Sequence, residues 1–365
     1  MLDKVQGICL TIFLATQFSL NSLYSPMLLI GWTALAGASV CEYLAPNKIE
    51  RPLWVLGALL FLQISQISAI PGAAIWGNGN WVLTAGVFLW VLPMPLVYMA
   101  ANQHIERWVC LFGVIHALFI IFQGFTDFDH TSSVVWFGSP EGFSHNPNIA
   151  AGLLILCLPF ATRGNLRWAL IPLLTAIIFT NSRWAFIVAS ILVMAMGYKN
   201  VISIRWVLVG LGSLLSGIGL MGLFTPVTAS VASFNSISYA QVVLENVSVR
   251  LSAPDWPNLL PYGVAETNGL HNVPMRMAAE SGVISAVVWV SLSVWALCRM
   301  RFSPAWWLMV SILLLSVLDH YTWRPHLMGF WFVALGILAV QPSKDDDNIN
   351  NIIPKRKDTD NNGDK

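Results

Sequence analysis

Residues 108–125, WVCLFGVIHALFIIFQGF, decide the fold class, because they run for eighteen residues without a charged side chain. A helix that crosses a bilayer needs about 20 mainly apolar residues. The rest of the chain continues this pattern, since 56% of its 365 residues are hydrophobic and 10% are charged. A soluble domain carries about 25% charged residues. We therefore predict an all-α integral membrane protein.

Twelve apolar segments are candidates for membrane-crossing helices. They lie near residues 5–20, 26–43, 53–71, 81–101, 108–125, 147–162, 168–181, 183–198, 204–224, 274–298, 304–318 and 326–341. Residues 1–342 are thus predicted to form one membrane domain. Residues 343–365 are rich in Asp, Asn and Lys and almost free of apolar side chains, which predicts a disordered tail.

Two of the connecting loops are long, at about 126–147 and 225–272. Loops of this length are usually functional or disordered. The second loop contains the apolar stretches 237–244 and 256–262, which favour short helices folded over the membrane domain.

The basic residues indicate an orientation, because cytoplasmic loops carry an excess of Lys and Arg. With the N-terminus inside, 15 of the 19 basic residues fall on the cytoplasmic side. These are Lys4, Lys48, Arg51, Arg107, Arg163, Arg167, Lys199, Arg205, Arg299, Arg301, Lys344, Lys355, Arg356, Lys357 and Lys365. We therefore expect both termini in the cytoplasm and both long loops outside.

The four remaining basic residues, Arg183, Arg250, Arg276 and Arg324, are all arginines on the outer side. The planar guanidinium group suits phosphate and carboxylate and keeps its charge when partly buried. For Arg276 and Arg324, contact with lipid headgroups or acidic neighbours is an equally good explanation. Arg183 stands in a short turn between two apolar segments, so it is predicted to face the protein interior or a water-filled cavity.

Most other polar residues are explained by packing. The five cysteines lie in apolar segments without metal-ligand spacing, so we expect packing residues and no disulfide framework. His116 is alone in an apolar segment and is expected to be a satisfied core residue. His320 and His326 flank Arg324, but their spacing in a loop is a weak ligand pattern, and no metal site is predicted. The cysteines are Cys9, Cys41, Cys110, Cys157 and Cys298.

His271 ends the second long loop directly before an apolar helix, and Asn272 follows it. The pair, nine residues and then Gly282 resemble the ligase motif of the O-antigen ligase and polymerase superfamily, which are membrane glycosyltransferases of bacterial envelopes. Glu280 also fits this motif. Ser285 is a departure, because ligases usually carry Gly, Thr or Tyr at that position.

Three further stretches resemble the same superfamily in the same order. Asn146-Pro147-Asn148 resembles its helix-opening Asn-Pro-Asn segment, and Ser182-Arg183 resembles its Ser-Arg turn. Residues 250–263 resemble the Arg…Trp…Pro…Gly stretch of its large periplasmic loop. The match covers about residues 140–340, whereas the first five helices resemble the family in hydropathy alone.

The resemblance implies a donor glycan on undecaprenyl diphosphate, used at the periplasmic face of the bacterial inner membrane in lipopolysaccharide biosynthesis. The acceptor would be a hydroxyl of lipid A-core, another glycan or a protein. A diphosphate leaving group needs charge neutralisation, which Arg183, Arg250 and Arg324 could supply without a metal or other cofactor. His271 suits the general base. Direct displacement would invert the anomeric centre.

The supporting positions of this site are Asn272, Ser182, Glu280, Gly282 and Asn148. A polymerase of the same superfamily would use the same donor with a growing glycan as acceptor, and the spacing from His271 to Gly282 favours the ligase. A lipid or polysaccharide transporter or flippase would carry charges deep within its helices, whereas here they cluster at one face. We expect no nucleic-acid partner.

Overall fold

A computed structural model describes residues 2–18, 26–45, 50–76, 91–126, 140–144, 146–224, 272–318 and 325–340. These residues form thirteen α-helices and two short 3₁₀ helices and contain no strand. The all-α class is therefore confirmed. The short helices predicted in the second long loop and the disorder predicted for the tail fall outside the described residues and stay predictions.

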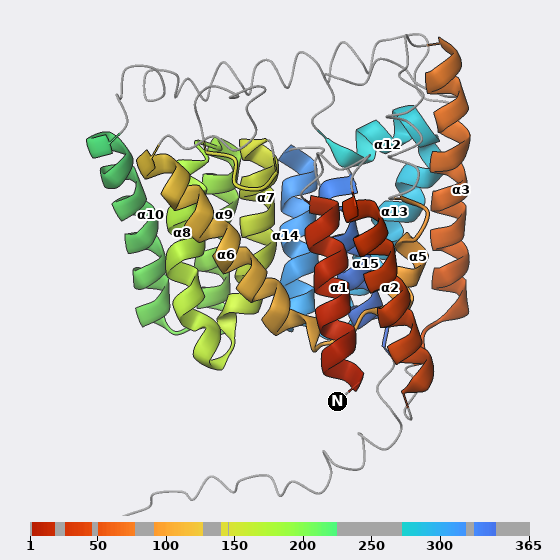
Figure 1. Ribbon diagram of the computed structural model, residues 1–365, viewed down its shortest axis with the longest axis horizontal. Helices are drawn as coiled ribbons and strands as arrows, with labels where there is room; N and C mark the ends of the chain where they lie inside the picture. The colour runs from red at the N-terminus through yellow and green to blue at the C-terminus, as the bar shows by residue number, and fades with distance from the viewer. Residues whose placement is uncertain are drawn as a thin grey trace, which may run out of the picture.

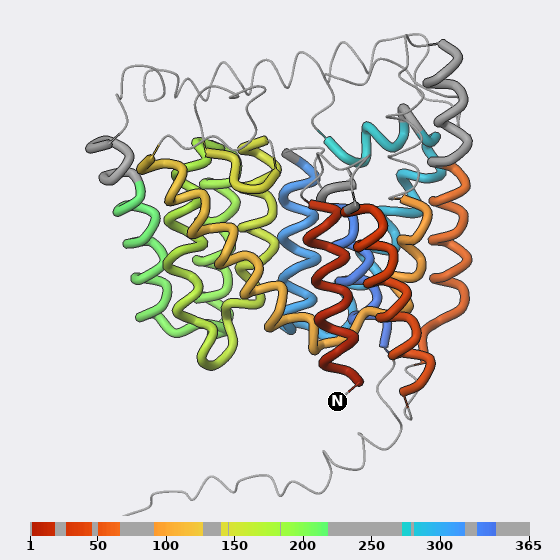
Figure 2. The backbone as a smooth tube through the Cα atoms, viewed as in Figure 1, coloured from red at the N-terminus to blue at the C-terminus, as the bar shows by residue number. Residues whose placement is uncertain are grey.

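Most helices run side by side in alternating directions, so the bundle has two ends (Figure 1). Their bounds are α1 Leu2–Phe18, α2 Pro26–Leu44, α3 Leu53–Trp76, α5 Met94–Ala100, α6 Ile105–Thr126, α7 Pro147–Cys157, α8 Leu170–Phe179, α9 Arg183–Tyr198, α10 Ile204–Phe224, α12 Val273–Ser281, α13 Val283–Leu297, α14 Pro304–Leu318 and α15 Pro325–Leu338. The 3₁₀ helices are Leu158–Thr162 and Gly164–Ala169. α6 is strongly tilted against its neighbours (Figure 2).

Helix boundaries agree best where apolar segments end at polar turns. The predicted segments 183–198, 204–224 and 304–318 coincide with α9, α10 and α14. The predicted continuous helix 274–298 is wrong, because Gly282 divides it into α12 and α13. Gly282 has φ 86° and ψ 156°, which no α-helix contains and which glycine adopts without a steric penalty.

The set of twelve membrane-crossing helices is not confirmed. In the described part of the chain, two helices are long and apolar enough to span a membrane: Met27–Leu44, with mean hydropathy 1.4, and Ile105–Thr126, with mean hydropathy 2.0. Other helices contribute apolar stretches of 10–17 residues whose side chains the structure describes, such as Leu53–Ser65 of α3 and Ile204–Gly217 of α10. About 20 residues are needed for a straight crossing.

The outside of the bundle is apolar, while several polar side chains lie inside. Leu53 is 81% exposed and Ile204 is 72% exposed, whereas Gln17, Gln63 and His116 are buried. The His116 ring packs edge-on against Phe18 at 4.8 Å between centroids, so the predicted core position of His116 is confirmed.

The cysteines divide into two groups. Cys41, Cys110 and Cys157 are buried, which confirms packing for these three, and Cys9 is partly buried. Cys298 is exposed at the end of α13, so the predicted packing role is wrong there. α13 ends at Leu297, one residue before the predicted end of the segment at Cys298.

The basic residues separate to the two ends of the bundle. Nine of those assigned to the cytoplasmic side belong to segments at the end where α1 begins (Figure 1). They are Lys4, Arg51, Arg107, Arg163, Arg167, Lys199, Arg205, Arg299 and Arg301. Arg183 begins α9 and Arg276 lies in α12, both at the opposite end.

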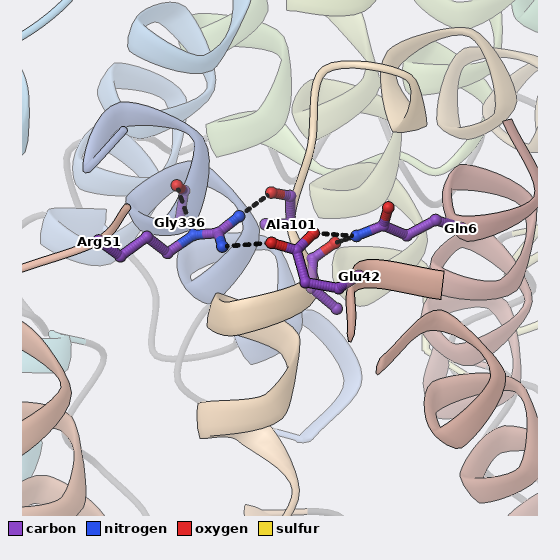
Figure 3. Close-up of polar contacts among 6 residues, drawn as sticks. Gln6, Glu42, Arg51, Ala101 and Gly336 are labelled. Atoms are coloured by element: carbon purple, nitrogen blue, oxygen red, sulfur yellow. Dashed lines mark hydrogen bonds and ion pairs between the residues drawn. The ribbon is translucent and has the colours of Figure 1, made fainter. Parts of the chain in front are cut away.

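A buried ion pair connects several helices at the end of the bundle where α1 begins (Figure 3). The Arg51 guanidinium lies 3.1 Å from the Glu42 carboxylate, with side-chain exposures of 1% and 16%. Arg51 also donates to the carbonyls of Ala101, at 2.5 Å, and Gly336, at 3.4 Å. Gln6 donates to Glu42 at 2.7 Å. Burial lowers the pKa of Arg51 and the Glu42 charge opposes this, so the guanidinium remains charged.

This network joins α1, α2, α5 and α15, and its loss should destabilise the bundle. We expect Arg51→Ala to lower the free energy of unfolding by about 3–5 kcal/mol, because the Glu42 carboxylate would remain buried without its partner. Thermal unfolding in detergent measures the change. Asp3→Ala is the matched control, since Asp3 and His104 form a half-exposed pair at 3.9 Å. Equal stability of the Arg51→Ala and Asp3→Ala variants would contradict the prediction.

Candidate functional site

The described parts of the predicted site lie at the end of the bundle opposite the N-terminus (Figure 1). α7, α9 and α12 all begin there, and α14 packs against all three. His271, Arg250 and Arg324 lie outside the described residues, and the structure describes Arg183 and Glu280 by their backbone alone. Their roles therefore stay predictions. The helix starts around them are described, and their capping residues define the framework of the site.

Asn272 fixes the chain where it enters α12. Its backbone is extended, with φ −140°, and its side-chain oxygen accepts from the Met275 N–H at 3.1 Å, which is an N-cap. Its amide nitrogen donates to the Val317 carbonyl of α14 at 3.2 Å. The Asn272 side chain thus pairs a backbone N–H in the first turn of α12 and also joins α12 to α14, directly after the position of His271.

Gly282 sets the direction of α12 relative to α13. Because the positive φ ends α12 after nine residues, α12 lies across the end of the bundle and packs against α3, α13 and α14 (Figure 1). Ser285 is buried just beyond the break, and its hydroxyl donates to the Ser281 carbonyl at 2.8 Å. Ser285, which departs from the ligase motif, is thus a small buried residue in the first turn of α13.

Asn146 caps α7 as Asn272 caps α12. Its side-chain oxygen accepts from the N–H groups of Asn148, at 2.9 Å, and Ile149, at 3.2 Å. Pro147 occupies the first helical position, where a missing N–H has no consequence. The side chain of Asn148 is exposed in the first turn of α7.

The turn before α9 holds Ser182 and begins the helix at Arg183. Asn181 has φ 55°, a left-handed conformation that asparagine tolerates better than most residues. Ser182 is buried and its N–H lies 3.4 Å from the Thr180 hydroxyl, which accepts the bond. The helix therefore starts immediately after a tight turn, as the predicted Ser-Arg turn requires.

Arg276 was not among the predicted site residues. It lies one helical turn beyond Asn272 on α12, and 6% of its surface is exposed. The alternative in which Arg276 extends to lipid headgroups is therefore wrong, because its side chain turns into the protein. The sequence could have indicated that Arg276 lies close to Asn272, because residues four positions apart share a helix face.

The capped helix starts restrict how this end could bind an anion. An open helix N-terminus offers free N–H groups to phosphate. At α7 and α12 the asparagine caps already accept from these N–H groups, whereas the start of α9 has no side-chain cap, so among the three helix starts α9 is the one open to an anion. Among the described residues, no group of three or more His, Cys, Asp or Glu is placed to hold a metal ion.

Comparison of the chain with models of known protein families and with curated protein sequences found no match. The assignment to a function therefore depends on the motifs in the sequence and on the positions that the structure gives them.

Proposed function

We propose that the chain is an integral membrane glycosyltransferase. It moves a glycan from undecaprenyl diphosphate to an acceptor hydroxyl at the periplasmic face of the bacterial inner membrane, as an O-antigen ligase does. One observation carries this proposal: the starts of α7, α9 and α12, which contain three of the ligase-like motifs, gather around one end of α14. α14 packs against each of these three helices and α7 packs against α9, so α14 links α12 to the other two.

The surface of the bundle supports a membrane location. Exposed apolar side chains occur along α3, α10 and α13, including Leu60, Leu208 and Val287. Soluble monomers rarely expose contiguous apolar patches beyond a few hundred Å². Lipid chains would cover such a surface without penalty. Short helices, such as α8 with 10 residues and α13 with 15, would then be accommodated by local thinning of the bilayer.

The orientation follows from the separation of the basic residues. The end of the bundle that carries Lys4 and eight further basic residues would face the cytoplasm. The opposite end, with Arg183 and Arg276, would face the periplasm, where the lipid-linked donor is used. Both termini would be cytoplasmic.

The reaction would be a single displacement. His271 takes the proton of the acceptor hydroxyl, and the hydroxyl oxygen attacks the anomeric carbon of the glycan. The bond from that carbon to the diphosphate oxygen breaks, and its electron pair leaves with the diphosphate. Arg183, Arg250 and Arg324 neutralise the charge that develops there. The configuration at the anomeric carbon is inverted, and no metal takes part.

Transfer by the purified chain tests the proposal. In liposomes that contain an undecaprenyl-diphosphate-linked glycan and lipid A-core, a ligase yields glycan-bearing lipid A-core and free undecaprenyl diphosphate. A polymerase instead yields a longer glycan on the lipid carrier. Movement of intact donor between leaflets, without release of undecaprenyl diphosphate, would identify a flippase and reject glycosyl transfer.

The orientation leads to a separate expected result. A reporter fused after Asn268 should be accessible from the periplasm, and one fused after Lys344 should be accessible from the cytoplasm, because the basic residues favour this arrangement. Protease or thiol-reagent accessibility in intact cells measures both positions. If the reporter after Asn268 lies in the cytoplasm, His271 does not share a compartment with the donor, and the proposed active site is wrong. A periplasmic reporter after Lys344 would contradict the predicted position of the C-terminus.

A further inference from the structure

Residues 140–144, which lead into α7, are held against one face of α6. The Gly142 N–H donates to the Gln123 side-chain oxygen at 2.7 Å. The Phe143 N–H lies 3.4 Å from Nδ1 of His116, which accepts it. The Phe143 ring stacks on Phe119, with 4.6 Å between centroids and 6° between planes. The three α6 residues are spaced by three and four positions, so they share one helix face.

The same segment is connected rigidly to the start of α7. The Ser144 hydroxyl lies 2.8 Å from the Glu141 carbonyl and 2.7 Å from the Asn146 carbonyl. Asn146 in turn caps α7. Contacts to α6 therefore fix not only residues 140–144 but also the first turn of α7, where Asn148 is exposed.

The fit between the segment and α6 is close. Gly142 has φ 61°, and a Cβ added there would lie 2.0 Å from Cε1 of His116. His116, Gln123 and Ser144 are all buried. Polar contacts in such a low-dielectric setting are stronger than in water, and they define one arrangement more narrowly than apolar packing does.

We propose that the α6 face formed by His116, Phe119 and Gln123 is a positioning platform for the donor site. It holds residues 140–144 and Asn146, and through them Asn148, at the end of the bundle where the lipid-linked glycan binds. This inference rests on the proposed function. The platform residues touch neither the reacting atoms nor the diphosphate, so they act on donor affinity through the exposed turn of α7.

The test compares two substitutions at Gln123 with a control on the same helix. Gln123→Ala removes the acceptor for Gly142, whereas Gln123→Glu keeps an oxygen at that place. Leu118→Ala is the control, because Leu118 is 55% exposed on the outward face of α6. We expect Gln123→Ala to raise KM for the donor about three- to tenfold with kcat little changed, as loss of one buried hydrogen bond allows.

Gln123→Glu should bring KM back to within about twofold of the wild-type value if the acceptor oxygen is what matters. His116→Asn, which keeps an acceptor close to the place of Nδ1, should disturb KM less than His116→Ala. Leu118→Ala should behave as wild type. A parallel change in KM for Gln123→Ala and Leu118→Ala would overturn the positioning role.

Hydrogen exchange at the Gly142 and Phe143 amides supplies a second measurement that needs no substrate. Faster exchange in Gln123→Ala than in Leu118→Ala is expected, because the Gly142 amide loses its acceptor. Faster exchange with an unchanged donor KM would show that α6 holds the segment without positioning the donor, and would overturn the proposal. If the wild-type chain transfers no glycan, the proposed function is wrong, and so is the role of the platform in donor binding. Hydrogen exchange at Gly142 and Phe143 then still decides whether α6 holds residues 140–144.

Discussion

His271→Ala should reduce glycan transfer by about 10²- to 10⁴-fold, because general-base catalysis contributes a factor of that size. The acceptor hydroxyl has a pKa far above 7 and attacks slowly without a base to take its proton. Release of undecaprenyl diphosphate from the lipid-linked donor, measured with the purified variant in liposomes, gives the rate. The wild-type rate should also fall at acid pH, since a protonated imidazole accepts no proton.

The framework around His271 makes this experiment interpretable. α12 is capped by Asn272 and connected to α14 through the Val317 carbonyl, so hydrogen bonds of a different residue hold the start of α12. The His271→Ala protein should therefore have wild-type abundance in the membrane and a wild-type melting temperature. Near-wild-type transfer by this variant would remove His271 from the mechanism and make His145 and His320 the next candidates.

Hydropathy predicted the helices because a bundle with an apolar interior and an apolar exterior needs apolar residues on every face of a helix. Such segments reveal where helices lie but not where they break. α12 contains Arg276 and Glu280 and is much more polar than α13, so the composition changes at Gly282 although the predicted segment 274–298 ran through it. The break depends on a backbone conformation that glycine permits without requiring it.

Contacts between segments that are distant in the sequence could not be predicted, for a different reason. Arg51 was interpreted as one of the basic residues that set orientation, and it is also buried against Glu42 with its other donors on the Ala101 and Gly336 carbonyls. His116 was correctly expected in the core. Its contact with Phe143, 27 positions later, depends on how α6 packs, which the residue pattern does not encode.

Parts of the candidate site were accessible from sequence because capping has a local signature. Asparagine followed by proline, or by a short residue and proline, favours a helix start, and Asn146 and Asn272 both cap helices. The roles of His271, Arg250 and Arg324 were inferred from chemistry and from resemblance, and these residues lie outside the described part of the chain. Their test is kinetic.

Arg183→Ala and Arg250→Ala should each lower turnover by one to several orders of magnitude. A hydrogen bond to an ionised group contributes about 1.5–3 kcal/mol, and each 1.4 kcal/mol is about tenfold in rate. The asparagine caps of α7 and α12 already accept from N–H groups in the first turns of these helices, so those two helix starts can compensate little for a lost guanidinium. Arg324→Ala should have a milder effect, because Asp319 is close to it in sequence and can serve as its partner.

Lysine at the same positions separates charge from geometry. Arg183→Lys and Arg250→Lys keep the positive charge and lose the planar pair of donors that matches a diphosphate, so we expect partial rescue of turnover. Full rescue would indicate a general electrostatic role, such as contact with lipid headgroups. Loss of both alanine variants from the membrane would instead indicate structural ion pairs, whose disruption unfolds the protein. Turnover should survive a strong chelator, and a reversible loss would return His320 and His326 to consideration as metal ligands.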